Sequence, residues 1–434
     1  MGAGEVRSAL LCSMPAVGHV GPMLVVAREL LRRGWRVRFL TGHRYRRLVE
    51  AAGAEFVALP AAADTLDEVG AGERNRGLAT INLGVEEAFV RPAYAAAEAV
   101  SALLAEEPAD AVLHDMTFLG VQVLFGRPAG ERPLTVMCGI GPAGFSSRDC
   151  PPYGLGIIPS TRHPSLGRVR DAVLNRTAKR VLRPAHRALD AYLASVGAPA
   201  LDGAFFMDVL GRSDLLAQFT VPGFEYPRSD GPSNLEFYGP MASARVPGAG
   251  SDTAMPEWWG ELDDARPLVH VTQGTVANTD FSEVVGPTLE ALAGEDVQVV
   301  VSAGGGDVAD LPPLPPNAFA AAYLDYDQLL PRTRAFVTNG GYGGLHQAMR
   351  YGVPIVIAGD SEDKVETSAR VQWSGAGLSL RTGRPTPAAV AAAVGRVIAE
   401  PRFAERSREL GREIAVARGA TGLVDDVETA LRAR

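Results

Sequence analysis

The sequence predicts an α/β protein that contains parallel sheets in more than one domain. Apolar runs of strand length alternate with segments that have the spacing of a helix face, and this alternation occurs in both halves of the chain. The length of 434 residues also exceeds what one hydrophobic core usually supports, so we expect two or three domains.

Strand, loop and helix follow one another at the start of the chain. Ser8–Ser13 is a short apolar run of strand length, and Pro15–Pro22 is rich in Pro and Gly, which predicts a loop. Residues 23–34 place apolar side chains on one helix face and stop at Gly34. Residues 141–164 have too little periodicity for a regular element, and loops of this length are usually functional or mobile. Further strands of this half are predicted at Arg36–Leu40, Ala111–Leu113 and Leu134–Met137.

The second half repeats the pattern after a change in composition. Pro222–Gly260 is rich in Pro, Gly and Ser, as linkers are. We therefore expect two Rossmann-like domains with a cleft between them. Strands of the second domain are predicted at Leu268–Thr272, Val297–Ser302, Ala318–Ala322, Ala335–Thr338 and Ile355–Ala358. The predicted boundaries are 1–220 for the first domain, 221–262 for the linker, 263–400 for the second domain and 401–434 for C-terminal helices.

Composition and charge argue against some classes of partner. The formal net charge of −8 disfavours nucleic acid and anionic membrane surfaces. No apolar run approaches the length of about 18 residues that spans a membrane. The N-terminus lacks the features of a signal peptide, and Cys12, Cys138 and Cys150 have no metal-ligand spacing. We therefore expect free thiols in a soluble cytoplasmic protein, either a monomer or a homodimer.

A histidine and an aspartate follow two predicted strands of the first domain. His19 comes after the first strand and just before a helix, where ligands bind in open α/β sheets. Asp115 ends another strand and would emerge at the same edge, where its carboxylate could hold the imidazole in one tautomer. The pair predicts a general base. The alternatives are a solvated loop histidine and a helix N-cap, and His114 should point the other way and be structural.

A glycine-rich segment of the second domain predicts a diphosphate site. Asn339-Gly340-Gly341-Tyr342-Gly343-Gly344 lies between a strand and a helical segment. Glycines let the backbone approach a ligand, and a helix N-terminus offers N–H groups and positive partial charge. The spacing is neither that of GxGxxG nor that of the P-loop, so a dinucleotide or ATP has no direct support. The alternative is a glycine turn without a ligand.

Three further segments lie near this predicted site. Gln273-Gly274-Thr275 is a second glycine turn and could hydrogen-bond the phosphates or an attached sugar. Asp363 follows the strand at Ile355–Ala358 and could accept bonds from sugar hydroxyls. Asp325-Tyr326-Asp327 has the form of a metal-binding aspartate pair, but such pairs are common by chance. We expect a solvated turn there, and no metal or other cofactor.

Several short segments follow one another in an order that resembles one family. They are Gly18-His19-Val20 with Pro22, Tyr238-Gly239-Pro240, Tyr323–Leu330, Phe336–Met349, Gly352-Val353-Pro354 and Asp363-Lys364. They are similar to the GHxxP loop, the Gly-Pro before the second domain, the W-x-P-Q segment, the FVTHGGxNSxxEAL signature, the GVP and the sugar-binding DQ pair of glycosyltransferase family 1. The chain resembles in particular the bacterial UDP-glycosyltransferase-like enzymes that act on natural products such as antibiotics.

The resemblance implies a GT-B fold and an inverting, metal-independent sugar transfer. The C-terminal domain would bind the donor and the N-terminal domain the acceptor, with the last helix crossing back to the first domain. His19 would be the base and Asp115 its partner. Tyr323 would stack on the nucleobase, Gln347 would bind the ribose, and Asp363 with Lys364 would hold the sugar.

The sequence departs from the family pattern at the donor site. Asn339 stands where the family usually has a phosphate-binding His, and Gly343 and Gly344 leave phosphate binding to the backbone. Lys364 replaces Gln, and Gln347 replaces Glu. The donor could therefore be a TDP-deoxysugar as well as a UDP-sugar.

The acceptor is expected to be a small lipophilic or aromatic metabolite, such as a polyketide or macrolide. The loop at 141–164 offers apolar side chains for a pocket, although it could instead be a structural flap whose apolar residues join the core. A nucleotide-sugar epimerase and a GT-B auxiliary protein without catalysis are the alternative functions. The predicted acceptor residues are Phe118, Phe145, Tyr153 and Ile157.

Overall fold

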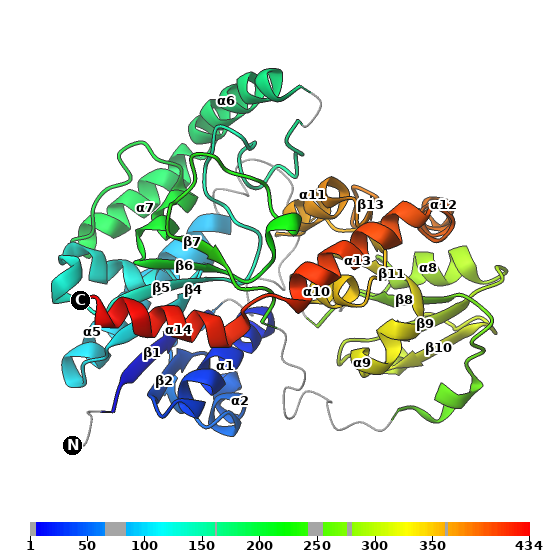
Figure 1. Ribbon diagram of the computed structural model, residues 1–434, viewed down its shortest axis with the longest axis horizontal. Helices are drawn as coiled ribbons and strands as arrows, with labels where there is room; N and C mark the ends of the chain where they lie inside the picture. Colours follow the sequence, from blue (N-terminus) through cyan, green and yellow to red (C-terminus); the bar gives the residue numbers. More distant parts are fainter. Residues whose placement is uncertain (1–5, 66–83, 161–162, 242–254, 276–279, 361–362) are drawn as a thin grey trace.

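The computed structural model describes residues 6–65, 84–160, 163–241, 255–275, 280–360 and 363–434. These residues form two sheets with helices on their faces, one in each lobe of the molecule (Figure 1). The strand order is β3-β2-β1-β4-β5-β6-β7 in the first sheet and β10-β9-β8-β11-β12-β13 in the second. Neighbouring strands run parallel in both sheets. The predicted fold class is confirmed.

The first lobe contains strands β1 to β7 and the helices that follow them. The strands are β1 (Ser8–Cys12), β2 (Arg36–Thr41), β3 (Glu55–Ala58), β4 (Ala111–Asp115), β5 (Leu134–Gly139), β6 (Leu215–Gln218) and β7 (Leu235–Phe237). The α-helices described here are α1 (Val17–Arg32), α2 (Arg46–Ala51), α5 (Arg91–Glu106), α6 (Pro164–Val181) and α7 (Arg183–Ser195).

The second lobe contains strands β8 to β13 and most of the later helices. The strands are β8 (Leu268–Thr272), β9 (Gln298–Ser302), β10 (Ala318–Ala321), β11 (Thr333–Thr338), β12 (Ile355–Ile357) and β13 (Gly377–Ser379). The helices are α8 (Val285–Leu292), α9 (Tyr326–Leu329), α10 (Tyr342–Arg350), α11 (Lys364–Ser374), α12 (Pro387–Ala399) and α13 (Pro401–Ala415), with α14 (Gly419–Arg432) ending the chain.

Each sheet has one point where the strand order reverses. In the first sheet this point lies between β1 and β4, and in the second it lies between β8 and β11. Ligands of open parallel sheets bind beyond the carboxyl ends of the strands at such a point. His19 follows β1, Asp115 ends β4, and the two glycine segments follow β8 and β11, so the topology places these residues where ligands are expected.

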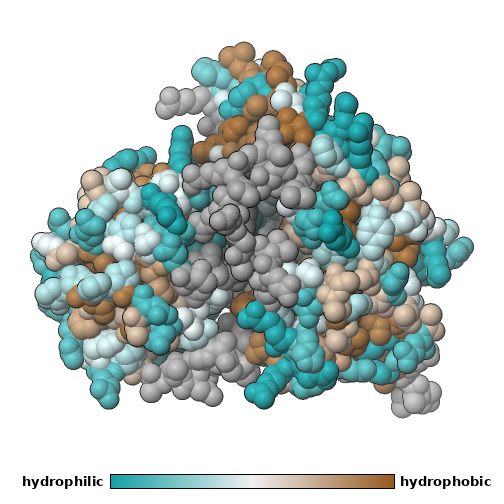
Figure 2. Space-filling view, turned by 180° about the vertical axis from the view of Figure 1, so that it is seen from behind, coloured by the Kyte–Doolittle hydropathy of each residue, from teal (hydrophilic) through white to brown (hydrophobic). Residues whose placement is uncertain are grey.

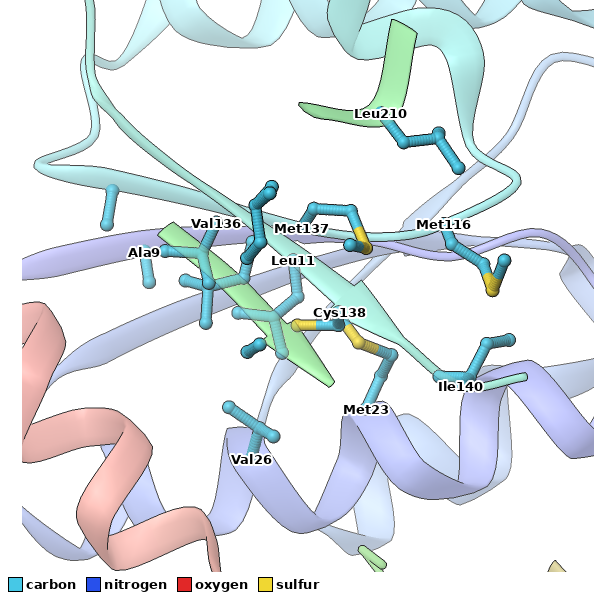
Figure 3. Packing of buried hydrophobic residues seen from close by; sticks show 14 of the residues in the cluster. Ala9, Leu11, Met23, Val26, Met116, Val136, Met137, Cys138, Ile140 and Leu210 are labelled. Carbon is cyan, nitrogen blue, oxygen red and sulfur yellow. The ribbon is translucent and has the colours of Figure 1, made fainter. Parts of the chain in front are cut away.

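The burial of the central strands in the core of the first lobe explains why they could be predicted from the sequence. Leu11 of β1, Val136 of β5 and Met23 and Val26 of α1 each have an exposed fraction of 0%. Figure 3 shows their side chains meeting between the sheet and α1. Strands buried on both faces read as continuous apolar runs. Cys138 lies in the same cluster, and all three cysteines are buried free thiols.

Some elements differ from the sequence prediction. α1 begins at Val17, so the predicted loop Pro15–Pro22 is mostly the first turns of a helix. Pro22 lies inside that helix, where it lacks the N–H that would bond to the carbonyl of Gly18. β7 lies within 221–262, the segment expected to be a linker, and extends the first sheet by pairing with β6. Residues 242–254 of that segment lie outside the described residues.

The end of the chain returns to the first lobe. α14 runs along this lobe in Figure 1, and Arg33, the C-cap of α1, donates to Asp425 over 2.7 Å. Tyr238, next to β7, donates its hydroxyl to Asp426 over 2.6 Å. The chain therefore passes between the lobes twice, once after β7 and once before α14.

The two passages lie side by side. The N–H of Gly419 donates to the carbonyl of Tyr238 over 2.8 Å. Gly239 has a φ of +79°, which favours glycine, and any Cβ there would collide with the Cβ of Ala417. This contact explains the glycine of the Tyr238-Gly239-Pro240 segment.

The surface is mixed in character, with apolar side chains gathered at the top of the view in Figure 2. Figure 1 places α6 at this end of the molecule. Leu166, Val169 and Val173 of α6 have exposed fractions of 70%, 65% and 62%. Among the described residues, no helix combines the length and the apolar character that crossing a membrane requires.

Candidate active site

Asp115 lies at the carboxyl end of β4, entirely buried. Its Oδ2 accepts the N–H of Met14 over 2.7 Å and the hydroxyl of Ser13 over 3.1 Å, both from the segment that follows β1. Burial alone would raise the pKa of this carboxyl, but the charge of His19 and the hydrogen bonds that reach it lower the pKa to about 2. Asp115 is therefore ionised at neutral pH.

His19 lies in the first turn of α1 and faces Asp115. Its N–H donates to the carbonyl of Ala16 over 2.9 Å, which holds it at the start of the helix. The ring Nδ1 lies 3.3 Å from Asp115 Oδ2, and 21% of the side chain is exposed. The two residues that the sequence predicted as a pair are thus in contact.

Thr117 also belongs to this site, although the sequence analysis missed it. Its backbone N–H and its hydroxyl donate to Asp115 Oδ1 over 2.7 and 2.6 Å. Its Oγ1 also lies 3.1 Å from Nδ1 of His19. The Asp-x-Thr spacing after a strand is a local signal for such a turn, since Asp side chains bond the backbone two residues on.

His114 has the structural role that its strand position predicted. It is 1% exposed, with Nε2 2.9 Å from the hydroxyl of Ser213. Its Nδ1 lies 3.0 Å from the carbonyl oxygen of Asp115. Burial lowers the pKa of His114 to about 4, so its ring is neutral at pH 7.

The glycine segment of the second lobe forms the entry to α10. Gly340 has a φ of +105°, and a Cβ there would lie 2.6 Å from Cδ1 of Ile357. Gly341 is the N-cap of α10, so no side chain occupies the first N–H groups of the helix there. Gly343 lies in the first turn and has no atom within 4 Å of its Cβ position. This turn combines backbone donors, helix dipole and open space, as phosphate sites do.

The side chains of Gln273 and Asn339, in the two glycine turns, form hydrogen bonds within the protein. Oε1 of Gln273 accepts the N–H groups of Val284 and Val285, each over 3.1 Å, at the start of α8. Asn339 donates its amide to the carbonyl of Gln273 over 2.6 Å and so ties the two glycine turns together. The sequence predicts that Asn339 binds phosphate and that the Gln273 turn bonds the phosphates or the sugar, whereas both side chains make these internal bonds in the structure. Gly274 and Thr275 remain at the surface of the turn, where Gly274 is partly exposed and Thr275 is exposed.

Tyr342 differs from the expectation because its side chain belongs to the core. It is 9% exposed and packs edge-on against His346, with ring centroids 4.5 Å apart, and against Phe224. Gly344, on the same helix turn, lies over the ring of Phe336. From this segment, backbone groups are what can reach a ligand.

Gln347, Asp363 and Lys364 have the positions that a donor site needs. The Oε1 of Gln347 is buried and has no hydrogen-bond partner within the part of the chain that the structure describes. Such an acceptor is suited to a ligand hydroxyl. A Cβ on Gly141 would lie 3.6 Å from Asp363 Oδ2 and 3.5 Å from Met116 Sδ, so Asp363 lies close to the Asp115 segment of the other lobe. Lys364 is 7% exposed at the start of α11.

A cavity of about 320 Å³ lies between the two lobes and is lined by residues of both. Tyr323 lines this cavity. Its hydroxyl lies so close to Gly305 that a Cβ at that position would collide with it. Val17, Val20 and Gly21, from the first turns of α1, also line the cavity. The other lining residues are Leu24, Arg44, Tyr45, Leu48, Thr275, Gly304 and Gly306.

The predicted acceptor residues do not all lie in one pocket. Phe118 is 1% exposed and Phe145 is 5% exposed, and both pack in the core of the first lobe. This corrects the expectation that they line a pocket. Tyr153 and Ile157 are partly exposed in the loop after β5. Burial, with the nearby charges of Asp363 and Glu366, raises the pKa of the Tyr153 hydroxyl.

The loop that carries Tyr153 is docked on the second lobe by Glu366. This carboxylate accepts the N–H groups of Gly154 and Gly156 over 2.9 and 3.0 Å. It also accepts Nη1 of Arg370 over 2.8 Å, within α11. The loop is therefore part of the contact between the lobes.

A buried ion pair joins the lobes behind this loop. Arg370 of α11, with an exposed fraction of 0%, donates to Glu225 over 2.9 Å and to the carbonyl of Ala143 over 3.0 Å. Glu225 also accepts the N–H of Ala143 over 2.9 Å. Burial would raise the pKa of Glu225, but the charges of Arg370 and Arg228 hold it below its ordinary value. The sequence analysis did not identify these residues, since no motif connects them.

The aspartate pair at the end of β10 is part of a short helix. Asp325 is the N-cap of α9 and accepts the N–H of Asp327 over 2.9 Å. Asp327 accepts the hydroxyl of Tyr351 over 2.5 Å. Among the described residues, no group of three metal-binding side chains comes together.

Comparison with known proteins points to glycosyltransferases. The model of the erythromycin biosynthesis protein CIII-like C-terminal domain matches residues 287–429. The chain is 39% identical to 4'-demethylrebeccamycin synthase of Lentzea aerocolonigenes, over 96% of this chain and 98% of that one. It is 31% identical to UDP-glycosyltransferase 2 of Phaeomoniella chlamydospora, over 96% and 94% of the two chains.

Solved structures agree with the sequence matches. The calicheamicin glycosyltransferase CalG4 has a TM-score of 0.69 at 25% identity and covers 98% of both chains. The glycotransferase of kitacinnamycin has a TM-score of 0.71 at 21% identity, over 98% of this chain and 99% of that chain. VinC, solved in complex with DTDP, has a TM-score of 0.65 at 19% identity, over 99% and 100%. The fold is therefore the GT-B fold.

His346 of α10 gives the stability of this region a predictable pH dependence. Its Nδ1 donates to the carbonyl of Tyr342 over 2.8 Å, and its Nε2 lies 2.6 Å from the hydroxyl of Thr220. Burial lowers its pKa to about 4, whereas an unfolded histidine titrates near pH 6.5. The unfolded state therefore binds more protons between these values, and stability should fall as the pH is lowered from about 6.5 to about 4.

Substituting His346→Gln should make this loss of stability less steep, as measured by urea unfolding from pH 7 to pH 4. His43→Gln at an exposed position is the control and should keep the wild-type slope. An unchanged slope in the His346 variant would contradict the prediction.

Proposed function

The chain belongs to glycosyltransferase family 1 and is a glycosyltransferase, and we propose that it moves a sugar from a UDP- or TDP-sugar to a small lipophilic natural product with inversion and without a metal. The single observation that carries the mechanism is the contact of His19 with the buried carboxylate of Asp115 at the end of β4. A histidine whose ring is hydrogen-bonded to an ionised carboxylate can act as the general base that deprotonates a hydroxyl group.

The proposed reaction has one step. His19 takes the proton of the acceptor hydroxyl while Asp115 stabilises the imidazolium. The acceptor oxygen forms a bond to the anomeric carbon as the bond from that carbon to the diphosphate oxygen breaks, which inverts the configuration. Backbone N–H groups at the start of α10 stabilise the charge that develops on the diphosphate.

The proposed donor site lies in the second lobe. Backbone groups of Gly341 and Gly343 would bind the diphosphate, Tyr323 would stack on the base, and Gln347 would accept a ribose hydroxyl. Asp363 would bind the sugar, beside the acceptor site. The relative from Phaeomoniella chlamydospora is named a UDP-glycosyltransferase, and VinC was solved with DTDP, so either base remains in the proposal.

The proposed acceptor site is the space between the His19 segment and the loop after β5. Tyr153 and Ile157 are side chains of that loop that stay partly exposed. Relatives and neighbours are named for rebeccamycin, calicheamicin and kitacinnamycin, which supports a natural product as acceptor.

Binding of UDP or TDP should raise the melting temperature, because a ligand that binds only the folded protein stabilises it. The gain is about 2.7 kcal/mol at a concentration of about 100 Kd. Gly343→Asp should abolish the shift, since it places a carboxylate in the open first turn of α10 where phosphate would bind. Gly343→Ala is the matched control and should keep the shift. Equal shifts of the melting temperature in both variants would show that the diphosphate does not bind at the first turn of α10.

Replacing His19 by Ala should lower kcat by about 10²- to 10⁴-fold, on the order of 3–5 kcal/mol in the barrier. Turnover of an acceptor library is the measurement, and His43→Ala at an exposed position is the control. Near-wild-type turnover in the His19 variant would exclude it as the base. Formation of an isomerised sugar from the donor alone would instead indicate an epimerase.

Metal chelation should leave the activity unchanged. The support for this prediction is that Asp325 caps α9 and Asp327 binds Tyr351, so both carboxylates already have internal partners. Rates measured in millimolar EDTA and with added Mg²⁺ or Mn²⁺ should agree. A loss in EDTA that Mg²⁺ restores would refute metal independence.

A further inference from the structure

Thr117 contacts both members of the proposed catalytic pair. Its Oγ1 lies 2.6 Å from Asp115 Oδ1 and 3.1 Å from His19 Nδ1. Its backbone N–H donates to the same Oδ1 over 2.7 Å, which places the residue in a tight turn beside the carboxylate. The hydroxyl of Thr117 is therefore held between the carboxylate and the ring.

The direction of these hydrogen bonds follows from the donors available. Both oxygens of Asp115 accept backbone N–H groups, from Thr117 and from Met14, so the carboxylate acts as an acceptor. A hydroxyl has one proton, and the shorter contact with an ionised acceptor takes it. Towards His19, the Thr117 oxygen can then only accept, so the proton of that contact is on Nδ1.

A second contact requires the same proton. Asp115 Oδ2 lies 3.3 Å from His19 Nδ1 and can also only accept from it. The two acceptors therefore share one N–H, with Thr117 the nearer. Ser13 cannot take the place of Thr117, because its hydroxyl lies against Asp115 Oδ2 and the carbonyl of Met14.

We propose that Thr117 is a positioning residue that, together with Asp115, holds His19 in the tautomer protonated at Nδ1 and leaves the lone pair of Nε2 for the acceptor proton. The use of that lone pair rests on the proposed function, whereas the tautomer does not. Thr117 acts through His19 and is given no contact with the substrate.

The test compares Thr117→Val, which keeps the shape and removes the hydroxyl, with Thr117→Ser, which keeps the hydroxyl. Val should lower kcat by about 10- to 100-fold, because the base is no longer held in one orientation, and should leave the KM of the donor unchanged. Ser should stay within about threefold of wild type. Thr41→Val is the matched control, because the buried hydroxyl of Thr41 has no hydrogen-bond partner among the described residues.

The tautomer is measured separately by ¹⁵N NMR of the histidine rings, with the His19 signals assigned from their loss in His19→Gln. Wild type should show a protonated Nδ1 and an unprotonated Nε2. Thr117→Val should show a larger share of the tautomer protonated at Nε2, because only the longer contact of 3.3 Å to Asp115 then accepts from Nδ1. An unchanged tautomer in Thr117→Val, or a wild-type kcat in it, would overturn the proposal. If His19→Ala keeps its turnover while Thr117→Val changes the tautomer, the base assignment fails and the role of Thr117 stands.

Discussion

The geometry of the candidate site in the first lobe depends on the hydrogen bonds that the buried carboxylate of Asp115 accepts. This carboxylate receives N–H groups from the segments that leave β1 and β4, so one charge fixes the exits of two neighbouring strands relative to each other. A buried charge is tolerated only when it is paired and hydrogen-bonded, and here these bonds also hold the ring of His19. Asp115 therefore has a structural role at the reversal of strand order, beside the chemical role proposed for it.

The junction of the lobes depends on a second buried set of charges. Arg370 binds Glu225 and the carbonyl of Ala143, while its neighbour Glu366 holds two N–H groups of the loop after β5. Removing one partner of such a network leaves an uncompensated charge inside the protein, which costs more than the pair contributes. The loop with Tyr153 is thereby held against α11, whose N-cap is Asp363. A residue proposed for the acceptor and one proposed for the sugar thus share a single support.

The sequence was informative where the physics is local or repetitive. β1, β4, β8 and β11 are mostly buried and contain short apolar runs, so the residues after them could be placed at the correct edge of each sheet. It was uninformative where contacts join distant segments. Glu225 and Arg370 are 145 positions apart and match no motif. Side-chain direction was also hidden: Phe118 and Tyr342 pack inward, because helical and turn geometry decided which way they point.

The adjoining passages at Tyr238 and Gly419 make the first lobe discontinuous in sequence. Its sheet is completed by residues before 241, and its last helix is supplied after the whole second lobe has been made. During synthesis the first lobe would therefore remain without α14 until the second lobe has been made. For recombination between relatives, the natural unit of exchange is the internal segment between Gly239 and Gly419, since a single cut would separate α14 from the helix surface it covers.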